Sequence, residues 1–247
     1  MKTFLSLLAA SCQLFAFAPA MAADFSVNPI RLELGAEVRS GAINVRNEST
    51  GKINFQLQAM AWTQDAEGKD RYEETSDLVY FPRIMTIEPG QEAVVRVGIR
   101  QALQATEKTY RLFIEELAPA ATDAAGAQIN MLIRFGAPVF VAPLKPEDGL
   151  VIEGLDLSQS VLKLTARNTG NRHQVVQGIA VRGTDATGSD VYALTLADRY
   201  LLTGTAKGYT TTVPAEQCKR MTGLSVEVKT DKRSVTQRLP VTPAMCR

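Results

Sequence analysis

Short runs of β-forming residues, separated by turn-forming ones, recur along the chain and constrain its fold more than any other feature. Val94-Val95-Arg96-Val97 shows the alternation of a half-buried strand, and no segment has a convincing helical period. Many short strands at this spacing predict an all-β sandwich or barrel. The strands predicted in the first half are Phe25–Leu34, Ala42–Asn47, Ile53–Trp62, Leu78–Phe81, Arg83–Ile87, Ala93–Ile99, Lys108–Leu117 and Ile129–Val141.

Pro143-Leu144-Lys145-Pro146 is the best internal boundary, because its two prolines do not fit a central strand. The strand rhythm restarts after it. We therefore predict two Ig-like β-sandwich domains, residues 23–143 and 144–247, joined by a short proline-containing hinge. The strands predicted in the second half are Leu150–Leu157, Val161–Asn168, Gln174–Thr184, Val191–Ala197, Thr210–Val213, Leu224–Lys229 and Ser234–Pro240.

Residues 1–22 have the pattern of a signal peptide. Lys2 supplies a positive start, an apolar run follows, and Ala20-Met21-Ala22 fits the small-x-small cleavage pattern. A lipoprotein site at Cys12 is the alternative, which the apolar sequence beyond it disfavours. The run is too short and too interrupted for a membrane span. We therefore expect an exported protein that is not membrane-embedded.

Charge and cysteine content narrow the partners and the compartment. Lys2 is the one charged residue of the predicted signal peptide, so 27 basic residues become 26, against 26 acidic ones. This balance argues against a nucleic-acid partner. Cys218 and Cys246 remain, and an even pair in an exported chain predicts a disulfide, worth about 3–4 kcal/mol in the loop-entropy model. The alternative, two free buried thiols, is disfavoured by an oxidising compartment.

We find no pattern that predicts catalysis, a metal site or a cofactor. The single histidine, His173, lies in a predicted turn, where we expect it to be solvated, and no cysteine or second histidine stands in metal spacing with it. In a strand, Glu115 and Glu116 point to opposite faces and form no acid–base pair. No serine has the context of a nucleophile elbow. We therefore expect a protein that is not an enzyme.

The stretch AQINMLIRFGAPVFVAP, from residue 127 to 143, predicts a long apolar strand beside a small, polar loop. Ile129, Met131 and Ile133 share one side of the extended chain, and Phe135 continues the apolar run. An edge strand of this kind is an aggregation liability that proteins normally blunt with charge or proline. Either the strand lies inside a sheet, or its stickiness is used.

Four segments of the first predicted domain resemble one known family. NPIRLEL is similar to the family's first strand with its cleft arginine, which falls on Arg31. FPRIMTIEPGQEAVVRVGI resembles its proline, proline–glycine turn and arginine-bearing strand, and YRLFIEELAP the strand before a flexible loop. QINMLIRFGAPVFVAP resembles its donor strand and hinge. The family is the periplasmic pilus-assembly chaperones of the chaperone–usher pathway. In the second half the resemblance is architectural only.

The resemblance implies a periplasmic chaperone without cofactors. It would bind pilin subunits by donor-strand complementation and deliver them to an outer-membrane usher. The implied donor side chains are Ile129, Met131, Ile133 and Phe135. On edge-protection grounds we also expect the unoccupied chaperone to hide this strand in a self-capping dimer.

The resemblance also implies a basic cleft that holds a carboxylate of the subunit. Arg31 matches the family's arginine, but the second anchor, a lysine in the strand before the hinge, falls on Pro138. The nearest substitutes are Arg134, whose phase is opposite to that of the donor side chains, and Arg83. For Arg96 we expect an ordinary outward strand position. The missing lysine implies a divergent or archaic branch.

Two other classes compete with this interpretation. An exported tandem Ig-like structural or adhesive subunit would need a groove of its own or a long N-terminal donor extension, and the predicted mature chain enters its first strand almost at once. An exported carbohydrate-active enzyme would need the acid–base pair that we do not find.

Overall fold

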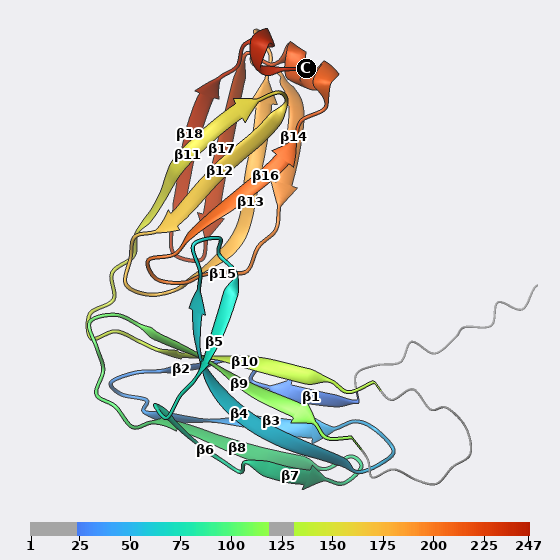
Figure 1. Cartoon of the computed structure of the whole chain (residues 1–247), viewed down its shortest axis with the longest axis vertical. Coiled ribbons are helices and arrows are strands. Elements are labelled where there is room, and N and C mark those ends of the chain that lie inside the picture. The colour runs from blue at the N-terminus through green and yellow to red at the C-terminus, as the bar shows by residue number, and fades with distance from the viewer. Residues whose placement is uncertain (1–23, 119–130) are drawn as a thin grey trace, which may run out of the picture.

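The structure, a computed structural model, describes residues 24–118 and 131–247. Two β-sandwiches meet at an elbow (Figure 1), each with two facing sheets and a hydrophobic core of its own. The predicted all-β fold of two sandwiches is thus confirmed. We propose residues 23–143 and 144–247 as the domain ranges, and the predicted signal peptide, 1–22, lies outside the described residues.

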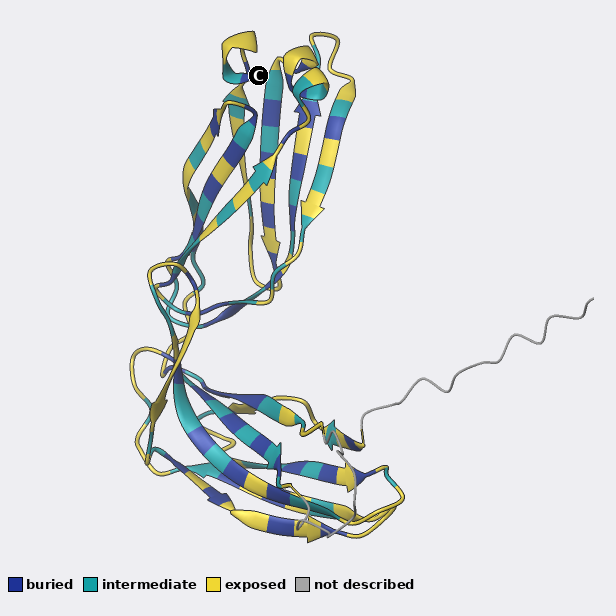
Figure 2. Ribbon diagram, turned by 45° about the vertical axis from the view of Figure 1, so that its right-hand side comes forward, coloured by how far each residue is buried: buried dark blue, intermediate teal, exposed yellow. Residues whose placement is uncertain are grey.

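The first sandwich pairs a sheet of order β1-β3-β8-β6 with a sheet of order β2-β10-β9-β4-β5, to which β7 adds by pairing with β4. Alternation creates its core: in β8, Val95 and Val97 are buried, whereas Val94 and Arg96 are exposed, as predicted. Buried and exposed residues alternate along strands of both sandwiches (Figure 2). The strands are β1 (Phe25–Asn28), β2 (Leu32–Leu34), β3 (Ser40–Asn47), β4 (Ile53–Gln64), β5 (Asp70–Glu74), β6 (Leu78–Phe81), β7 (Ile84–Ile87), β8 (Glu92–Ile99), β9 (Lys108–Glu116) and β10 (Arg134–Val141).

The single strand predicted over Phe25–Leu34 is wrong: it is two strands in two different sheets. β1 pairs antiparallel with β3, whereas β2 pairs parallel with β10. Pro29, which follows a cis peptide bond, lies between them. Proline has no backbone N–H to continue a ladder, so the chain leaves one sheet here and joins the other.

The second sandwich pairs a sheet of order β11-β12-β16 with a sheet of order β14-β13-β17-β18, to which β15 adds by pairing with β13. Its elements are β11 (Leu150–Ser158), β12 (Val161–Asn168), β13 (Gln174–Thr184), β14 (Asp190–Leu196), β15 (Tyr200–Leu201), β16 (Ala206–Thr212), α1 (Ala215–Arg220), β17 (Gly223–Thr230), β18 (Ser234–Pro240) and a 3-10 helix, η1 (Pro243–Met245).

The predicted disulfide is confirmed. Cys218 of α1 is bonded to Cys246, next to η1, with 5.6 Å between the Cα atoms. Both cysteines belong to the core of the second sandwich, so the bond ties the C-terminal segment to that core.

Aromatic packing closes the elbow between the sandwiches. Trp62, at the end of β4, is buried with Phe140 of β10 and Leu202 of the second sandwich, and the ring of Tyr200 meets the indole edge-on at 5.4 Å. Gln64 adds two hydrogen bonds: its amide donates to the Tyr200 carbonyl at 3.1 Å and accepts from the Leu202 N–H at 3.0 Å. The end of β4 is therefore docked on the second sandwich.

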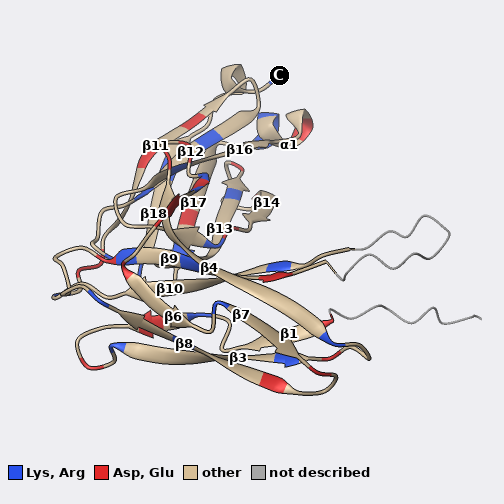
Figure 3. Ribbon diagram, turned by 60° about the horizontal axis from the view of Figure 1, so that its bottom comes forward, with Lys and Arg blue, Asp and Glu red and all other residues tan. Residues whose placement is uncertain are grey.

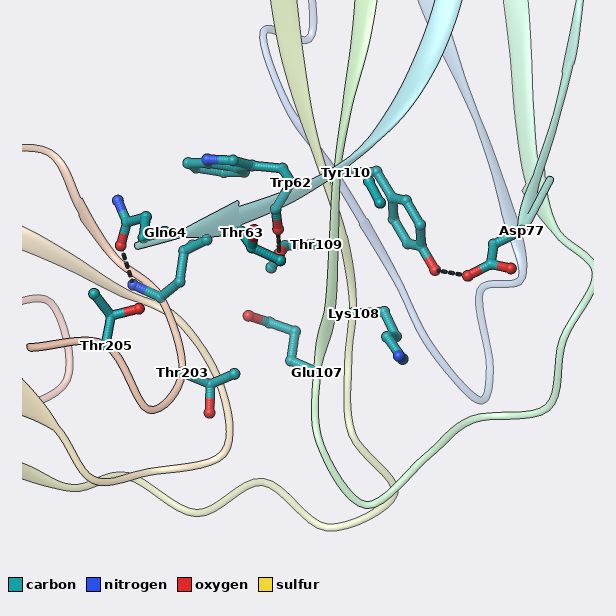
Figure 4. Close-up of a pocket in the computed structure, with 12 residues that line it drawn as sticks. Trp62, Thr63, Gln64, Asp77, Glu107, Lys108, Thr109, Tyr110, Thr203 and Thr205 are labelled. Atoms are coloured by element: carbon teal, nitrogen blue, oxygen red, sulfur yellow. Dashed lines mark hydrogen bonds between the residues drawn. The ribbon is translucent and has the colours of Figure 1, made fainter. Parts of the chain in front are cut away.

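His173 is buried at the elbow, so the predicted solvated position is wrong. Its backbone N–H donates to Oε2 of Glu107 at 2.7 Å, its Nδ1 lies 2.9 Å from the same carboxylate, and its ring stacks on Phe140 at 3.6 Å. Glu107 comes from the first sandwich, and its carboxylate is the hydrogen-bonding partner that permits the burial of the His173 ring. Figure 4 shows Glu107, Lys108 and Gln64 around a pocket of about 360 Å³ between the sandwiches.

Candidate functional site: the open edge of β10

β10 has a partner along its whole length on one side only. It pairs with β9 from Arg134 to Val141, but on its other side β2 covers only Val139–Val141. Within residues 24–118 and 131–247, no strand pairs with the remaining edge. We call Arg134–Pro138 the open half of β10 and Val139–Val141 its covered half. Burial increases along the strand: Arg134 is exposed, Phe135 and Gly136 are partly buried, and every residue from Ala137 onward is buried.

Hydrogen bonds show which backbone groups face the open edge. The N–H of Glu116 donates to the carbonyl of Ile133 at 3.0 Å, so odd-numbered residues bond to β9. The N–H of Ala142 donates to the carbonyl of Leu34 at 2.8 Å, so even-numbered residues face the side of β2. The N–H and C=O groups of Arg134 and Gly136 therefore point to the open edge, where another strand can pair with them.

The predicted donor side chains flank this edge, except Ile129, which lies outside the described residues. Met131 is 84% exposed. Ile133 and Phe135 are half-buried and pack against the core of the first sandwich. The apolar side chains on this side of the chain are thus partly buried at Phe135 and Ile133 and largely exposed at Met131.

Arg31 lies where the open edge ends. It precedes Leu32, whose partner is Val139, and therefore lies beside Pro138 in register. Its Nη2 is 3.1 Å from Oε1 of Glu33, and both side chains are largely exposed. An exposed ion pair of this kind contributes little stability, so the guanidinium can exchange its partner at small cost.

The two other predicted anchor residues do not join Arg31. Arg83 precedes β7 at the opposite margin of the sheet, where it donates to the Tyr80 hydroxyl at 2.8 Å. Arg134 lies on the outer face, as Arg31 does. It is four residues before Pro138, however, and this spacing corresponds to about 13 Å between the two residues along a strand. Its Nε lies 3.4 Å from Oε2 of Glu115.

A basic residue that the sequence analysis missed lies much nearer. Arg111 of β9 is directly opposite Pro138, on the outer face of the sheet. Its guanidinium stacks on Trp62 at 3.8 Å, donates from Nη1 to the Gly136 carbonyl at 3.0 Å, and lies 3.7 Å from Oδ2 of Asp70. Arg31 and Arg111 therefore flank Pro138 from the two neighbouring strands.

The surroundings of Arg111 hold one titratable group with a shifted pKa. Tyr72 donates its hydroxyl to Oδ2 of Asp70 at 3.1 Å. Burial and the Asp70 charge raise the pKa of Tyr72.

Neither a metal site nor a membrane-spanning helix is found in the described part of the chain. Residues 24–118 and 131–247 contain no cluster of three or more metal-ligating acidic, histidine or cysteine side chains. The same residues include no helix with the length and hydrophobicity of a membrane span. Basic and acidic residues are interspersed over both sandwiches (Figure 3).

The sequence profile of one family covers the first sandwich. This family, described as "Pili and flagellar-assembly chaperone, PapD N-terminal domain", matches residues 24–147. The chain belongs to this family. It is therefore a pilus-assembly chaperone of a periplasmic family and not an enzyme, which confirms both predictions. No curated protein sequence matches the chain significantly.

Solved structures agree with the chaperone fold over most of the chain. A chain of the CsuC–CsuE chaperone–tip adhesion subunit pre-assembly complex, from archaic Csu pili of Acinetobacter baumannii, is similar with a TM-score of 0.59 and 17% identity, covering 87% of this chain and 97% of that chain. The CupB2 chaperone of Pseudomonas aeruginosa has a TM-score of 0.54 and 14% identity, with 87% and 100% covered. A chain of the Salmonella enterica SafA pilin–SafB chaperone complex has a TM-score of 0.54 and 14% identity, covering 89% of this chain and 98% of that chain.

Proposed function

We propose that this chaperone binds pilin subunits along the open half of β10 and delivers them to an outer-membrane usher. The observation that carries the proposal is the unpaired edge itself, which begins beside exposed Met131 and ends beside Arg31. A subunit strand that pairs there satisfies the backbone groups of Arg134 and Gly136. Main-chain pairing supplies affinity and the alternate side chains supply specificity.

The apolar side chains supply most of the binding free energy in this proposal. Met131, Ile133 and Phe135 alternate along one side of the chain, and Ile129 continues this alternation in the sequence. A subunit that lacks a strand offers a groove for such a row of side chains. Burying one such side chain is worth about 1.5–3 kcal/mol, before the costs of ordering and association. No nucleotide is needed, because the folding free energy of the subunit drives the later step in which another strand replaces the strand of the chaperone.

Arg31 is the proposed anchor for a carboxylate of the subunit. A guanidinium binds a carboxylate through paired, charge-assisted hydrogen bonds, which are stronger than the exposed contact with Glu33. The anchor fixes the register of the subunit strand, so that each apolar side chain meets its pocket.

Co-expression with pilin-type subunits encoded beside the chaperone gene, followed by a pull-down, tests the proposal. We expect Met131→Asp to abolish co-purification and Arg31→Ala to reduce it, both with unchanged folding. Val151→Asp, at an exposed apolar position of β11, is the matched control and should bind normally. Capture of subunit by Met131→Asp at the wild-type level would exclude the donor role.

Three finer points belong to the same proposal. First, the usher receives the complex in the periplasm. Second, the chaperone belongs to a divergent or archaic branch, because Pro138 stands where the family has its second anchor lysine. Third, two unoccupied chaperones cap each other through their open edges. Light scattering over a concentration series tests the last point: a dimer that Met131→Asp dissociates supports it, and a monomer at all concentrations contradicts it.

A further inference from the structure

Gly136 is the only residue of β10 without a side chain, and it lies in the open half of the strand. Its N–H and C=O groups face the open edge, and it shares the outer face with Arg134 and Pro138. A strand that pairs with this edge, parallel or antiparallel, places one residue beside Gly136 with about 5 Å between the Cα atoms. The side chain of that residue lies on the outer face and meets no side chain of β10.

The ring of Phe113 occupies the space above Gly136. Phe113 lies directly opposite Gly136 on β9. A Cβ on Gly136 would be 3.0 Å from Cε1 and 3.3 Å from Cδ1 of this ring. Both distances are shorter than an ordinary carbon–carbon contact of about 3.5–4.0 Å, so the ring takes the place of a side chain at this position. A strand paired with the open edge would therefore contact Phe113 across the glycine.

Phe113 is held in this position by two neighbours. The ring of Tyr72 meets it edge-on, with 5.3 Å between the centroids. The guanidinium carbon of Arg134 lies 3.9 Å from the centroid of the Phe113 ring. Phe113 nevertheless remains only half-buried. A ring that is fixed and still accessible is a preorganised contact surface, so little entropy is lost when a partner covers it.

The charges around Gly136 narrow the kind of side chain that fits beside it. Arg134 lies two residues before it, and Nη1 of Arg111 donates to its carbonyl at 3.0 Å. A cationic side chain would be repelled by both guanidinium groups, and a carboxylate would lose its water over the Phe113 ring. An aromatic ring avoids both costs, because it packs against Phe113 and attracts a guanidinium to its face. Aromatic side chains also compensate for a glycine on a neighbouring strand.

We infer that Gly136 and Phe113 form a recognition site for an aromatic side chain on the subunit strand that pairs with the open half of β10. The site lies on the outer face, opposite to Met131, Ile133 and Phe135, and therefore selects among subunits independently of the donor side chains. This inference rests on the proposed binding of subunits to β10, and it adds the chemical class of one subunit residue and the two chaperone residues that it contacts.

A double-mutant cycle with a co-expressed pilin-type subunit, encoded beside the chaperone gene, tests the inference. On the chaperone, Phe113→Leu keeps an apolar side chain over Gly136 and removes the ring. On the subunit, each aromatic residue of the strand that pairs with β10 is replaced by leucine in turn. Competition between variant and wild-type chaperone for the subunit gives the relative affinities. We expect Phe113→Leu to weaken binding of the natural subunit about three- to tenfold, as for the loss of an aromatic pair, and to leave binding of one leucine variant unchanged.

Two further chaperone variants control this result. Phe81→Leu, the same exchange at an exposed position of β6 in the other sheet, should bind the natural subunit normally. Gly136→Ala places a Cβ against the Phe113 ring and should weaken binding of the natural subunit more than that of the leucine variant. Trp62 is the only tryptophan of the chain, so its fluorescence verifies that each variant is folded.

The outcomes separate the two proposals. A wild-type chaperone that binds no subunit overturns subunit binding at β10 and this inference with it. A subunit that binds Phe113→Leu as tightly as the wild type, or a bound subunit whose pairing strand has no aromatic residue, overturns the recognition site alone. An equal loss for the natural subunit and for every leucine variant would mean that Phe113 only supports the sheet, and would also overturn it.

Discussion

The open half and the covered half of β10 are consecutive segments of one strand, and both pair with β9 in one register. They differ on the other side. Val139–Val141 has β2 beside it and is buried, with Phe140 stacked on His173 of the second sandwich. Arg134–Pro138 has no such neighbour in the described structure: Ala137 and Pro138 are buried, but Phe135 and Gly136 are only partly buried and Arg134 is exposed.

This difference shows how one strand serves both structure and binding. The covered half fixes β10 in the sheet and to the elbow, so the open half is presented in an extended conformation before a partner arrives. Such preorganisation lowers the entropy cost of strand pairing. In the open half, in contrast, the outward backbone groups of Arg134 and Gly136 have no strand partner in the described structure, as the proposed binding of a subunit requires.

Val139→Asp should have the largest effect on folding. Val139 has no exposed surface and lies between Tyr110 of β9 and Leu32 of β2. An unpaired carboxylate buried there costs more than about 4 kcal/mol, a large share of the stability of a typical domain. Circular dichroism and Trp62 fluorescence should show an unfolded first sandwich. A folded variant with nearly wild-type stability would remove the distinction between the halves.

Phe135→Ala probes the boundary between folding and binding. Its side chain packs against the core but stays half-exposed, so we expect a loss of about 1–2 kcal/mol of stability, below the 3–5 kcal/mol of a fully buried phenylalanine. We also expect roughly tenfold weaker subunit binding. Urea denaturation followed by Trp62 fluorescence and calorimetric titration with a subunit measure the two effects. A loss in stability alone would assign Phe135 to the chaperone's own core.

The sequence predicted features that depend on local pattern. Alternation placed Val95 and Val97 in the core and Arg96 outside, and the compartment argument paired Cys218 with Cys246. The proline-marked segment, residues 143–146, lies between β10 and β11, and the domain ranges on either side of it stay a proposal. Each of these follows from residue type and short-range periodicity, which the fold does not override.

Features that depend on strand register could not be predicted from the sequence. Arg111 is one of several outward residues of β9, and only the register of the sheet places it opposite Pro138. His173 looked solvated because its partner, Glu107, belongs to the other sandwich. Pro29 was visible, but its effect of sending Phe25–Asn28 and Leu32–Leu34 to different sheets requires the neighbours of both strands.

Arg134→Ala should have the smallest effect, which sharpens the contrast with Val139. Arg134 and its partner Glu115 are each 47% exposed, and the guanidinium also lies over Phe113 at 3.9 Å. Exposed ion pairs contribute about 0.2–1 kcal/mol, so we expect a loss below about 1 kcal/mol. In about 1 M salt, where the Debye length is about 3 Å, the variant and the wild type should have nearly equal urea midpoints. A loss of several kcal/mol that persists in salt would mean that the open half is a structural element in its own right.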